Sequence, residues 1–149
     1  MDEGSIPQLG GCQCGAIRYQ LDGKPEYVSY CHCVDCRKAT GALMVTYAVH
    51  EIEQVHFNGE RKTYTSTPGV QRTFCPACGT PLSYEAEWQG RIVIGVFVGT
   101  LDNADALPPE MHVFDIDRVS WFDVADHLPR YHQHPFSETP VRYGPVGST

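Results

Sequence analysis

The stretch C-H-C-V-D-C at residues 31–36 carries three of the seven cysteines in this chain of 149 residues. The other four lie in C-Q-C at residues 12–14 and in C-P-A-C at residues 75–78. Such spacings are typical of thiolate metal sites, because alternate residues of a strand share a face and a tight turn can aim two sulfurs at one point. The seven cysteines divide into a set of four and a set of three, and the two sets predict different roles.

The set of four predicts a closed, structural zinc site. Zinc bonds thiolate sulfur at about 2.3 Å, so two sulfurs on one tetrahedral ion lie about 3.8 Å apart. Glycines flank the C-Q-C pair and another follows C-P-A-C, which allows the backbone to bend at both places. The site would tie the first strand to one far along the chain and couple metal binding to folding. Its predicted ligands are Cys12, Cys14, Cys75 and Cys78.

The set of three predicts a second zinc with an open coordination position. Its predicted ligands are Cys31, Cys33 and Cys36. No eighth cysteine is present to close the site, and an open position is what allows a zinc site to do chemistry. His32 lies between two ligands and points away from them on an extended chain, so we expect it to pack or to form hydrogen bonds.

Two alternatives stay open for this second site. A distant histidine would make it another closed, structural zinc site. The candidates are His50, His56, His112, His127, His132 and His134. The other alternative is partial occupancy, because three ligands bind a metal more weakly than four.

Two cations follow the third ligand directly. Arg37 and Lys38 are candidates for binding the carboxylates of an acidic substrate; the alternative is that both are solvated surface residues. Zinc lowers the pKa of a bound thiol and polarises a carbonyl group. Three thiolates leave the site with a net negative charge, which favours activation of a thiol over hydrolysis.

Charge and hydropathy narrow the class of partner and the compartment. The formal net charge of −7 disfavours nucleic acid as a partner, since phosphate neutralisation supplies much of the affinity for nucleic acid.

No apolar run approaches the roughly 18 residues of a membrane span, and the first residues lack the features of a signal peptide. We therefore expect a cytoplasmic protein with reduced cysteines. The chemistry of the open zinc site leads us to expect a small-molecule thiol as its partner. Disulfides are the alternative, although an odd count leaves one thiol unpaired. The oligomeric state stays open, with a homodimer as one option.

Strand patterns dominate the chain, so the predicted fold class is mostly β with little helix. The predicted strands cover residues 14–21, 26–30, 42–49, 51–57, 61–66, 70–74, 82–87 and 91–98. Asn58-Gly59 predicts a hairpin between 51–57 and 61–66. Short helical turns are expected from Arg37 to Gly41 and over 121–127.

The chain is expected to form one domain over residues 9–134. Residues 1–8 are expected to be flexible, and residues 135–149 to form an extended or poorly ordered tail. Four acidic residues between 115 and 126 lie in a segment that we expect to be exposed and solvated. They are Asp115, Asp117, Asp123 and Asp126.

Three blocks of sequence carry a resemblance to a known family. They are G-G-C-Q-C-G-A-I-R-Y (10–19), C-H-C-V-D-C-R-K-A-T-G-A (31–42) and R-T-F-C-P-A-C-G-T-P-L-S-Y (72–84). A weaker block covers His112 and residues 121–131, which end in L-P-R-Y. In these blocks the chain resembles the glutathione-dependent formaldehyde-activating enzyme (GFA) family, also described as centromere-protein-V-like (CENP-V) zinc domains.

The resemblance implies a β-tent of antiparallel sheets joined by a four-cysteine zinc site. It assigns the set of four cysteines to this structural zinc and the set of three to a zinc near the substrate. The implied activity is that of a carbon–sulfur lyase, which forms S-hydroxymethylglutathione from glutathione and formaldehyde. The competing functions are a non-catalytic carrier of glutathione or another small thiol, and a purely structural zinc domain that mediates interactions.

Overall fold

The computed structural model describes residues 6–147 and is built mainly of short strands. Among these residues the one α-helix is α1 (Val34–Thr40), so the prediction of a mostly β fold is confirmed. The chain divides into two compact units. The first unit comprises the chain up to Tyr27 together with Ala48–Pro108, and the second comprises Val28–Tyr47 together with the chain from Pro109 onward.

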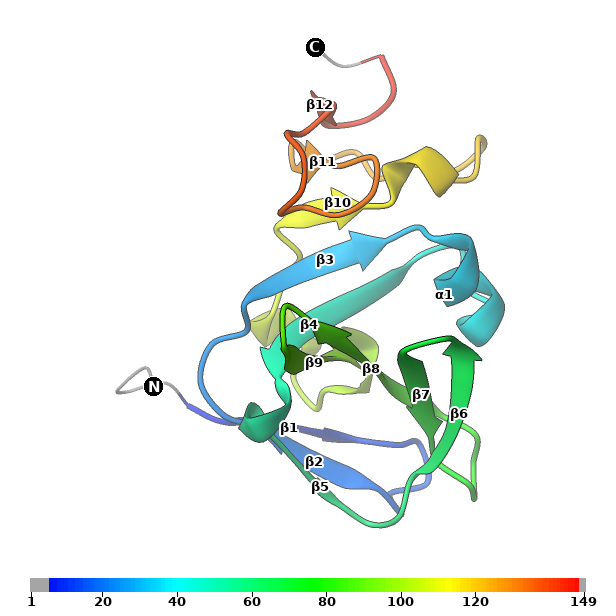
Figure 1. Ribbon diagram of the computed structural model, residues 1–149, viewed down its shortest axis with the longest axis vertical. Helices are drawn as coiled ribbons and strands as arrows, with labels where there is room; N and C mark the ends of the chain where they lie inside the picture. The colour runs from blue at the N-terminus through cyan, green and yellow to red at the C-terminus, as the bar shows by residue number, and fades with distance from the viewer. Residues whose placement is uncertain (1–5, 148–149) are drawn as a thin grey trace. The chain divides into compact units, whose positions relative to one another are not determined.

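The first unit contains two sets of neighbouring antiparallel strands (Figure 1). In one set the order is β1-β2-β5, and in the other it is β6-β7-β8-β9. The strands are β1 (Gln8–Gly11), β2 (Arg18–Leu21), β5 (Val55–Asn58), β6 (Lys62–Thr67), β7 (Val70–Phe74), β8 (Pro81–Trp88) and β9 (Arg91–Phe97). Short 3₁₀ turns are η1 (Ile52–Gln54), η2 (Val98–Thr100) and η3 (Ala104–Ala106).

Alternation of polar and apolar residues explains how these strands bury one face. In β2 the side chains of Tyr19 and Leu21 are buried while Arg18 and Gln20 are exposed. In β9, by contrast, consecutive residues from Val93 to Phe97 are all buried. A strand covered on both faces needs such a continuous apolar run.

The second unit holds β10 (Met111–Val113) between two parallel neighbours. β10 pairs with β3 (Tyr27–Cys31) on one side and with β11 (Pro129–Arg130) on the other, as Figure 1 shows. β12 (Arg142–Tyr143) completes the order β12-β11-β10-β3 and is antiparallel to β11. The expectation named antiparallel sheets, and most strand pairs are antiparallel, but these two pairs are parallel, so the arrangement is mixed. The remaining elements are η4 (Asp115–Asp117) and β4 (Val45–Glu51), within which the boundary between the units falls.

The predicted hairpin at Asn58-Gly59 is wrong. β5 pairs with β2, and β6 pairs with β7, so the dipeptide marks a crossing between two sets of strands rather than a turn within one. Gly59 is needed here for another reason. Its φ is +102°, and a Cβ atom built on it would lie 2.5 Å from the carbonyl oxygen of Ala16.

The helical turn expected over residues 121–127 is also wrong. The other helix, α1, stops at its C-cap residue Gly41 as predicted, but it begins at Val34 rather than at Arg37. The Asp123 carboxylate accepts a hydrogen bond from the backbone N–H of Val124, and Asp126 accepts one from Leu128. Such local side-chain to backbone bonds compete with helical ones. The segment therefore runs as an irregular loop.

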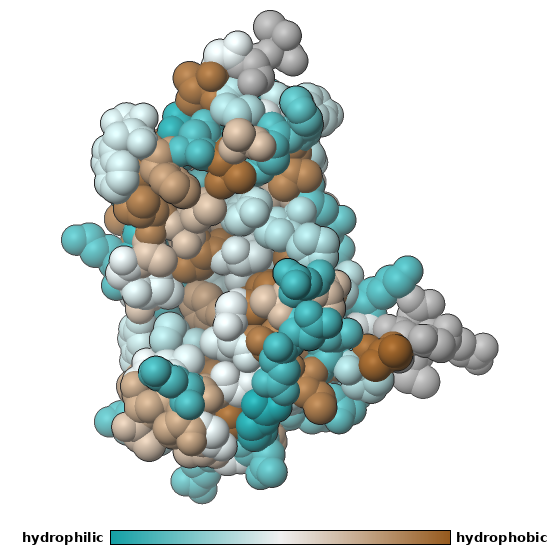
Figure 2. Space-filling model, turned by 180° about the vertical axis from the view of Figure 1, so that it is seen from behind, coloured by the Kyte–Doolittle hydropathy of each residue, from teal (hydrophilic) through white to brown (hydrophobic). Residues whose placement is uncertain are grey.

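Parts of the two ends predicted to be loose lie outside the described residues, namely 1–5 and 148–149. Within the described range β1 begins at Gln8, and β12 pairs with β11 through Arg142 and Tyr143. No helix among residues 6–147 combines the length and the apolar character that crossing a membrane requires. On the face in Figure 2, hydrophobic side chains reach the surface in separate groups with hydrophilic ones between them.

Replacing Gly59 by alanine is expected to destabilise the protein by about 3 kcal/mol, because the added methyl group meets backbone in a left-handed conformation. Gly69→Ala is the matched control, since φ is +85° there and no heavy atom lies within 4 Å of the added Cβ. We expect it to cost about 1 kcal/mol, from backbone strain alone. Urea unfolding of both variants measures the difference. Equal costs would contradict the close approach of Gly59 to Ala16.

Candidate functional site

Four cysteine sulfurs of the first unit meet at one point. The Sγ atoms of the C-Q-C and C-P-A-C pairs all lie within 4.8 Å of one another. The Cys12 and Cys14 sulfurs are 3.6 Å apart, and those of Cys14 and Cys75 are 3.8 Å apart. These separations match the spacing of about 3.8 Å expected for sulfurs on one tetrahedral zinc. The four residues are therefore able to hold a metal ion.

Backbone turns aim these sulfurs. In C-P-A-C-G the Gly79 N–H donates to the Cys75 carbonyl at 2.8 Å, and the Cys75 N–H donates to the Thr80 carbonyl at 3.0 Å. Gly79 closes the turn with φ of +80°, a conformation that favours glycine. The turn also directs the Cys78 N–H at the Cys75 sulfur, at 3.5 Å. The turn therefore fixes the position of the Cys75 sulfur relative to Cys78.

One cysteine of this group, Cys78, has a pKa that favours the thiolate form. The Thr80 hydroxyl lies 3.1 Å from the Cys78 sulfur and lowers the pKa of Cys78 to about 5. A cysteine with such a pKa is ionised near neutral pH. All seven cysteines are free thiols rather than disulfides in this structure.

The set of three also comes together, in the second unit. Cys31 ends β3, Cys33 is the N-cap residue of α1, and Cys36 lies in the first turn of that helix. Their Sγ atoms lie within 4.8 Å of one another, and those of Cys31 and Cys36 are 3.5 Å apart. The Cys36 N–H donates to the Cys33 sulfur at 3.3 Å. Among residues 6–147 no histidine, aspartate or glutamate joins the group.

Crowding makes it costly to ionise these three sulfurs together. Hydrogen bonding to Cys33, and then to Cys36, raises the pKa of Cys31 well above its ordinary value. Three neighbouring thiols resist ionising together unless a positive charge compensates them. Cys31 and Cys36 are buried, while Cys33 is partly exposed. The Tyr47 hydroxyl, which is also buried, lies 3.2 Å from the Cys36 sulfur.

The two predicted substrate-binding cations lie on α1, but on different faces. The Arg37 N–H donates to the Cys33 carbonyl at 3.1 Å, so Arg37 is one helical turn from Cys33 and shares its face. Its Nε atom is buried without a hydrogen-bond partner. Lys38 stands one turn from Val34, which is exposed. By helical position Arg37 therefore shares the face of Cys33, whereas Lys38 shares the face of the exposed Val34.

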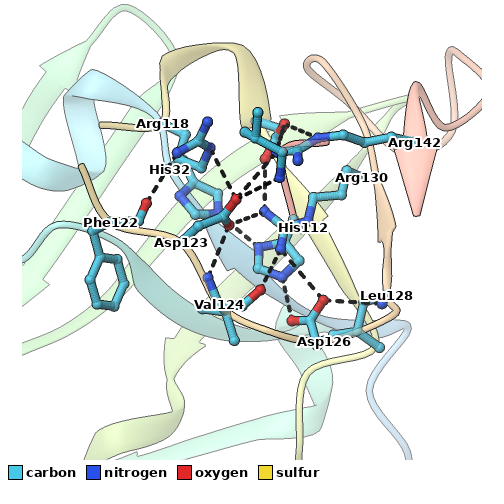
Figure 3. A network of polar contacts seen from close by, with 12 residues as sticks. His32, His112, Arg118, Phe122, Asp123, Val124, Asp126, Leu128, Arg130 and Arg142 are labelled. Carbon is cyan, nitrogen blue, oxygen red and sulfur yellow. Dashed lines mark hydrogen bonds and ion pairs between the residues drawn. The ribbon is translucent and has the colours of Figure 1, made fainter. Parts of the chain in front are cut away.

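His32 packs and forms hydrogen bonds, as predicted. Its Nε2 atom lies 2.8 Å from Nδ1 of His112, and Nε2 of His112 lies 2.7 Å from the Asp126 carboxylate. The His112 ring also stacks on Tyr30, with 4.6 Å between ring centroids. Figure 3 shows the His112 ring between His32 and Asp126. Burial lowers the pKa of His32 to about 4 and also lowers that of His112.

The expectation that the acidic residues between 115 and 126 are solvated is wrong for three of them. Arg130, which is 0% exposed, donates to Asp115 at 3.2 Å and to Asp123 at 2.6 Å. Arg142 donates to the second oxygen of Asp115 at 2.9 Å. Asp126 contacts the same Arg130 side chain at 3.5 Å (Figure 3). Sequence reasoning missed this network because its arginines lie beyond the acidic segment, and only the L-P-R-Y block pointed to Arg130.

Comparison with known proteins gives a consistent result. Residues 8–117 match the family described as glutathione-dependent formaldehyde-activating enzyme. An uncharacterized lyase of Schizosaccharomyces pombe is 29% identical over 75 residues, which make up 50% of this chain and 55% of that protein. The chain thus spans about half the length of this curated relative. A crystal structure of a Rhodobacter sphaeroides protein has a TM-score of 0.52 at 22% identity, covering 64% of this chain and 88% of that one.

The family match includes every cysteine of both groups, and also His112. It ends before Asp123, Asp126 and Arg130, so the buried ion-pair network lies partly outside it. The structural likeness concerns the fold alone. Since the match covers well over half of the chain, this protein belongs to the glutathione-dependent formaldehyde-activating enzyme family.

Proposed function

We propose that this protein is a zinc-dependent enzyme of the carbon–sulfur lyase type that acts on small thiol–aldehyde adducts, in the manner of an S-hydroxymethylglutathione synthase. The observation that carries the proposal is the unequal number of sulfurs in the two cysteine groups. Four sulfurs complete a tetrahedral zinc, whereas three leave one position for an outside molecule. Membership of the family supports glutathione and formaldehyde as the substrates that we propose.

The donor sets fit zinc in both groups. All donors are thiols, and their spacing suits tetrahedral sulfur ligation. Thiolate ligands favour zinc over hard ions such as magnesium and calcium. Cys12, Cys14, Cys75 and Cys78 would hold the structural ion, and Cys31, Cys33 and Cys36 the accessible one. An ion in the second group would lower the pKa of a substrate thiol and polarise an aldehyde carbonyl. Free thiols suit a reducing compartment, and we propose the cytoplasm.

The reaction balances without an oxidant or reductant. The sulfur of glutathione forms a bond to the carbonyl carbon of formaldehyde, and the thiol proton is transferred to the carbonyl oxygen. The reverse reaction breaks the same carbon–sulfur bond. The chain's own task is to bind the thiol and to hold it against the aldehyde.

Arg37 is the residue that we propose binds a carboxylate of the thiol substrate. It stands one helical turn from Cys33, which is the most accessible of the three sulfurs. Its buried Nε–H has no partner within the described residues, so an incoming carboxylate would satisfy it. A guanidinium group and a carboxylate can pair through two parallel hydrogen bonds.

Metal analysis should find two zinc ions per chain. Cys33→Ser is expected to lose one of them and to keep the fold, because the four-cysteine group is untouched. Cys14→Ser should lose the fold, since a structural zinc contributes on the order of 10 kcal/mol that is coupled to folding. Elemental analysis and thermal melting by circular dichroism measure both effects. A chelator-treated protein that melts at the holo temperature would show that the structural assignment is wrong.

Formation of S-hydroxymethylglutathione, followed by NMR exchange with the uncatalysed rate subtracted, tests the activity itself. We expect a rate above background that Cys33→Ser abolishes. A protein that binds glutathione in a calorimetric titration but adds nothing to the rate would be a thiol carrier. One that shows neither binding nor rate would be a structural zinc domain.

Arg37→Ala is expected to raise KM for glutathione about tenfold, because a charge-assisted hydrogen bond contributes about 1.5–3 kcal/mol before solvent screening reduces it. Lys38→Ala removes a neighbouring charge of the same sign and should leave KM within about twofold. Steady-state kinetics on both variants measures the contrast. An equal rise of KM in the two variants would show that Arg37 acts only through its positive charge and not by binding the carboxylate directly.

A further inference from the structure

A chain of hydrogen bonds connects the segment after residue 117 to the three-cysteine segment. It runs from the Asp126 carboxylate to His112 at 2.7 Å and from His112 to His32 at 2.8 Å. His32 lies between Cys31 and Cys33 in sequence. His32 and His112 are almost fully buried, at 2% and 0% exposed, so water cannot replace these contacts readily.

The chemistry of the groups fixes the position of each proton in this chain. An ionised carboxylate can only accept, so Nε2 of His112 must carry the proton that is donated to Asp126. A neutral His112 ring then accepts at Nδ1. His32 must therefore donate from its Nε2 atom, which leaves its Nδ1 atom without a proton. Asp126 thus sets the tautomers of both histidines.

β10 holds His32 by its backbone as well. The His32 N–H donates to the carbonyl of Val113 at 3.1 Å, and Val113 is the register partner of Cys31 in the parallel pair of β3 and β10. His112, on the same short strand, contacts the His32 ring. Main chain and side chain of the residue between two sulfurs are therefore anchored to one neighbouring strand.

We infer that His112 and Asp126 are positioning residues: by holding His32, they fix the separation of the Cys31 and Cys33 sulfurs and so set how tightly the three-cysteine group retains a thiophilic metal ion. Without this hold on His32, the three sulfurs would shift whenever the short segment that carries them moves. Partners that hydrogen-bond directly to metal-ligating side chains change metal affinity by about 10- to 100-fold. His112 and Asp126 act one residue away, through His32, so we expect an effect near the lower end of that range. The inference rests on the metal-binding part of the proposed function and not on its chemistry.

The anchor is itself well supported. The second oxygen of Asp126 accepts from the Leu128 N–H at 3.1 Å and faces Arg130 at 3.5 Å. Arg130 is fully buried, and its strand pairs with β10 at His112. One oxygen of Asp126 thus faces Leu128 N–H and Arg130, which can only donate. The other oxygen faces the His112 ring, which can carry its proton on either nitrogen.

This arrangement makes Asp126→Asn a sharp test. The amide oxygen of asparagine should turn toward Leu128 and Arg130, because both are obligatory donors, and the amide N–H should face His112. His112 must then accept at Nε2 and donate from Nδ1, so His32 must accept at Nε2 and carry its proton on Nδ1. The two tautomers are distinguished by long-range ¹⁵N–¹H NMR of the imidazole rings.

In the zinc-loaded native protein we expect His32 and His112 to carry their protons on Nε2. In Asp126→Asn both protons should move to Nδ1, and one of the two zinc ions should be released to 4-(2-pyridylazo)resorcinol about tenfold faster or more. Release of the second ion should stay unchanged. Asp123→Asn is the control, because it removes a carboxylate from the same Arg130 without touching His112.

Equal acceleration of zinc release in Asp123→Asn and Asp126→Asn would overturn the inference, as would a native His32 with its proton on Nδ1. The second measurement needs no variant, so it holds even if Asp126→Asn does not fold. A native protein with only one zinc per chain would overturn the open zinc site and this inference together. Two zinc ions with unaltered release in Asp126→Asn would overturn the positioning role alone.

Discussion

Crowded sulfur is the constraint on which the rest of this structure depends. Thiols held 3.5–3.8 Å apart cannot all ionise unless a cation lies among them. The two groups meet this constraint in different ways. In the first unit the proposed ligands come from segments far apart in the sequence, so a metal there would organise the fold that presents it. In the second unit all three proposed ligands come from residues 31–36, so a metal alone would not fix the surroundings of that segment.

Those surroundings are supplied by a short parallel strand and the polar network behind it. β10 has only three residues, yet it pairs with β3 and β11 and carries His112 into contact with His32. Behind it Arg130 is fully buried among carboxylates, and such charges remain in an interior only when they are paired. Phe114, directly after β10, has φ of +53°, a strained value that persists where the neighbouring structure holds the backbone firmly.

The sequence predicted the features that depend on local spacing, and it failed where distant charges meet. Both cysteine groups, the strand β7 and the end of α1 at Gly41 follow from motifs a few residues long. Asn58-Gly59 misled because glycine serves a close backbone approach as readily as a turn, and no local pattern separates the two. The acidic residues after 114 look solvated because their partners, Arg130 and Arg142, lie beyond them in the chain. The partners of a buried ion pair can lie far apart in the sequence, so they leave no periodic pattern in any short stretch of it.

The boundary of the family match therefore has a physical meaning. Residues 8–117 contain every proposed metal ligand, but Asp126 and Arg130, which hold His112 in place, follow that boundary. In the proposed arrangement the ligands determine which metal is bound, whereas the partners of His32 determine how rigidly the three-cysteine site is held. Two chains with the same seven cysteines and different C-terminal segments would then share the four-cysteine site and differ in how firmly the three-cysteine site keeps its metal.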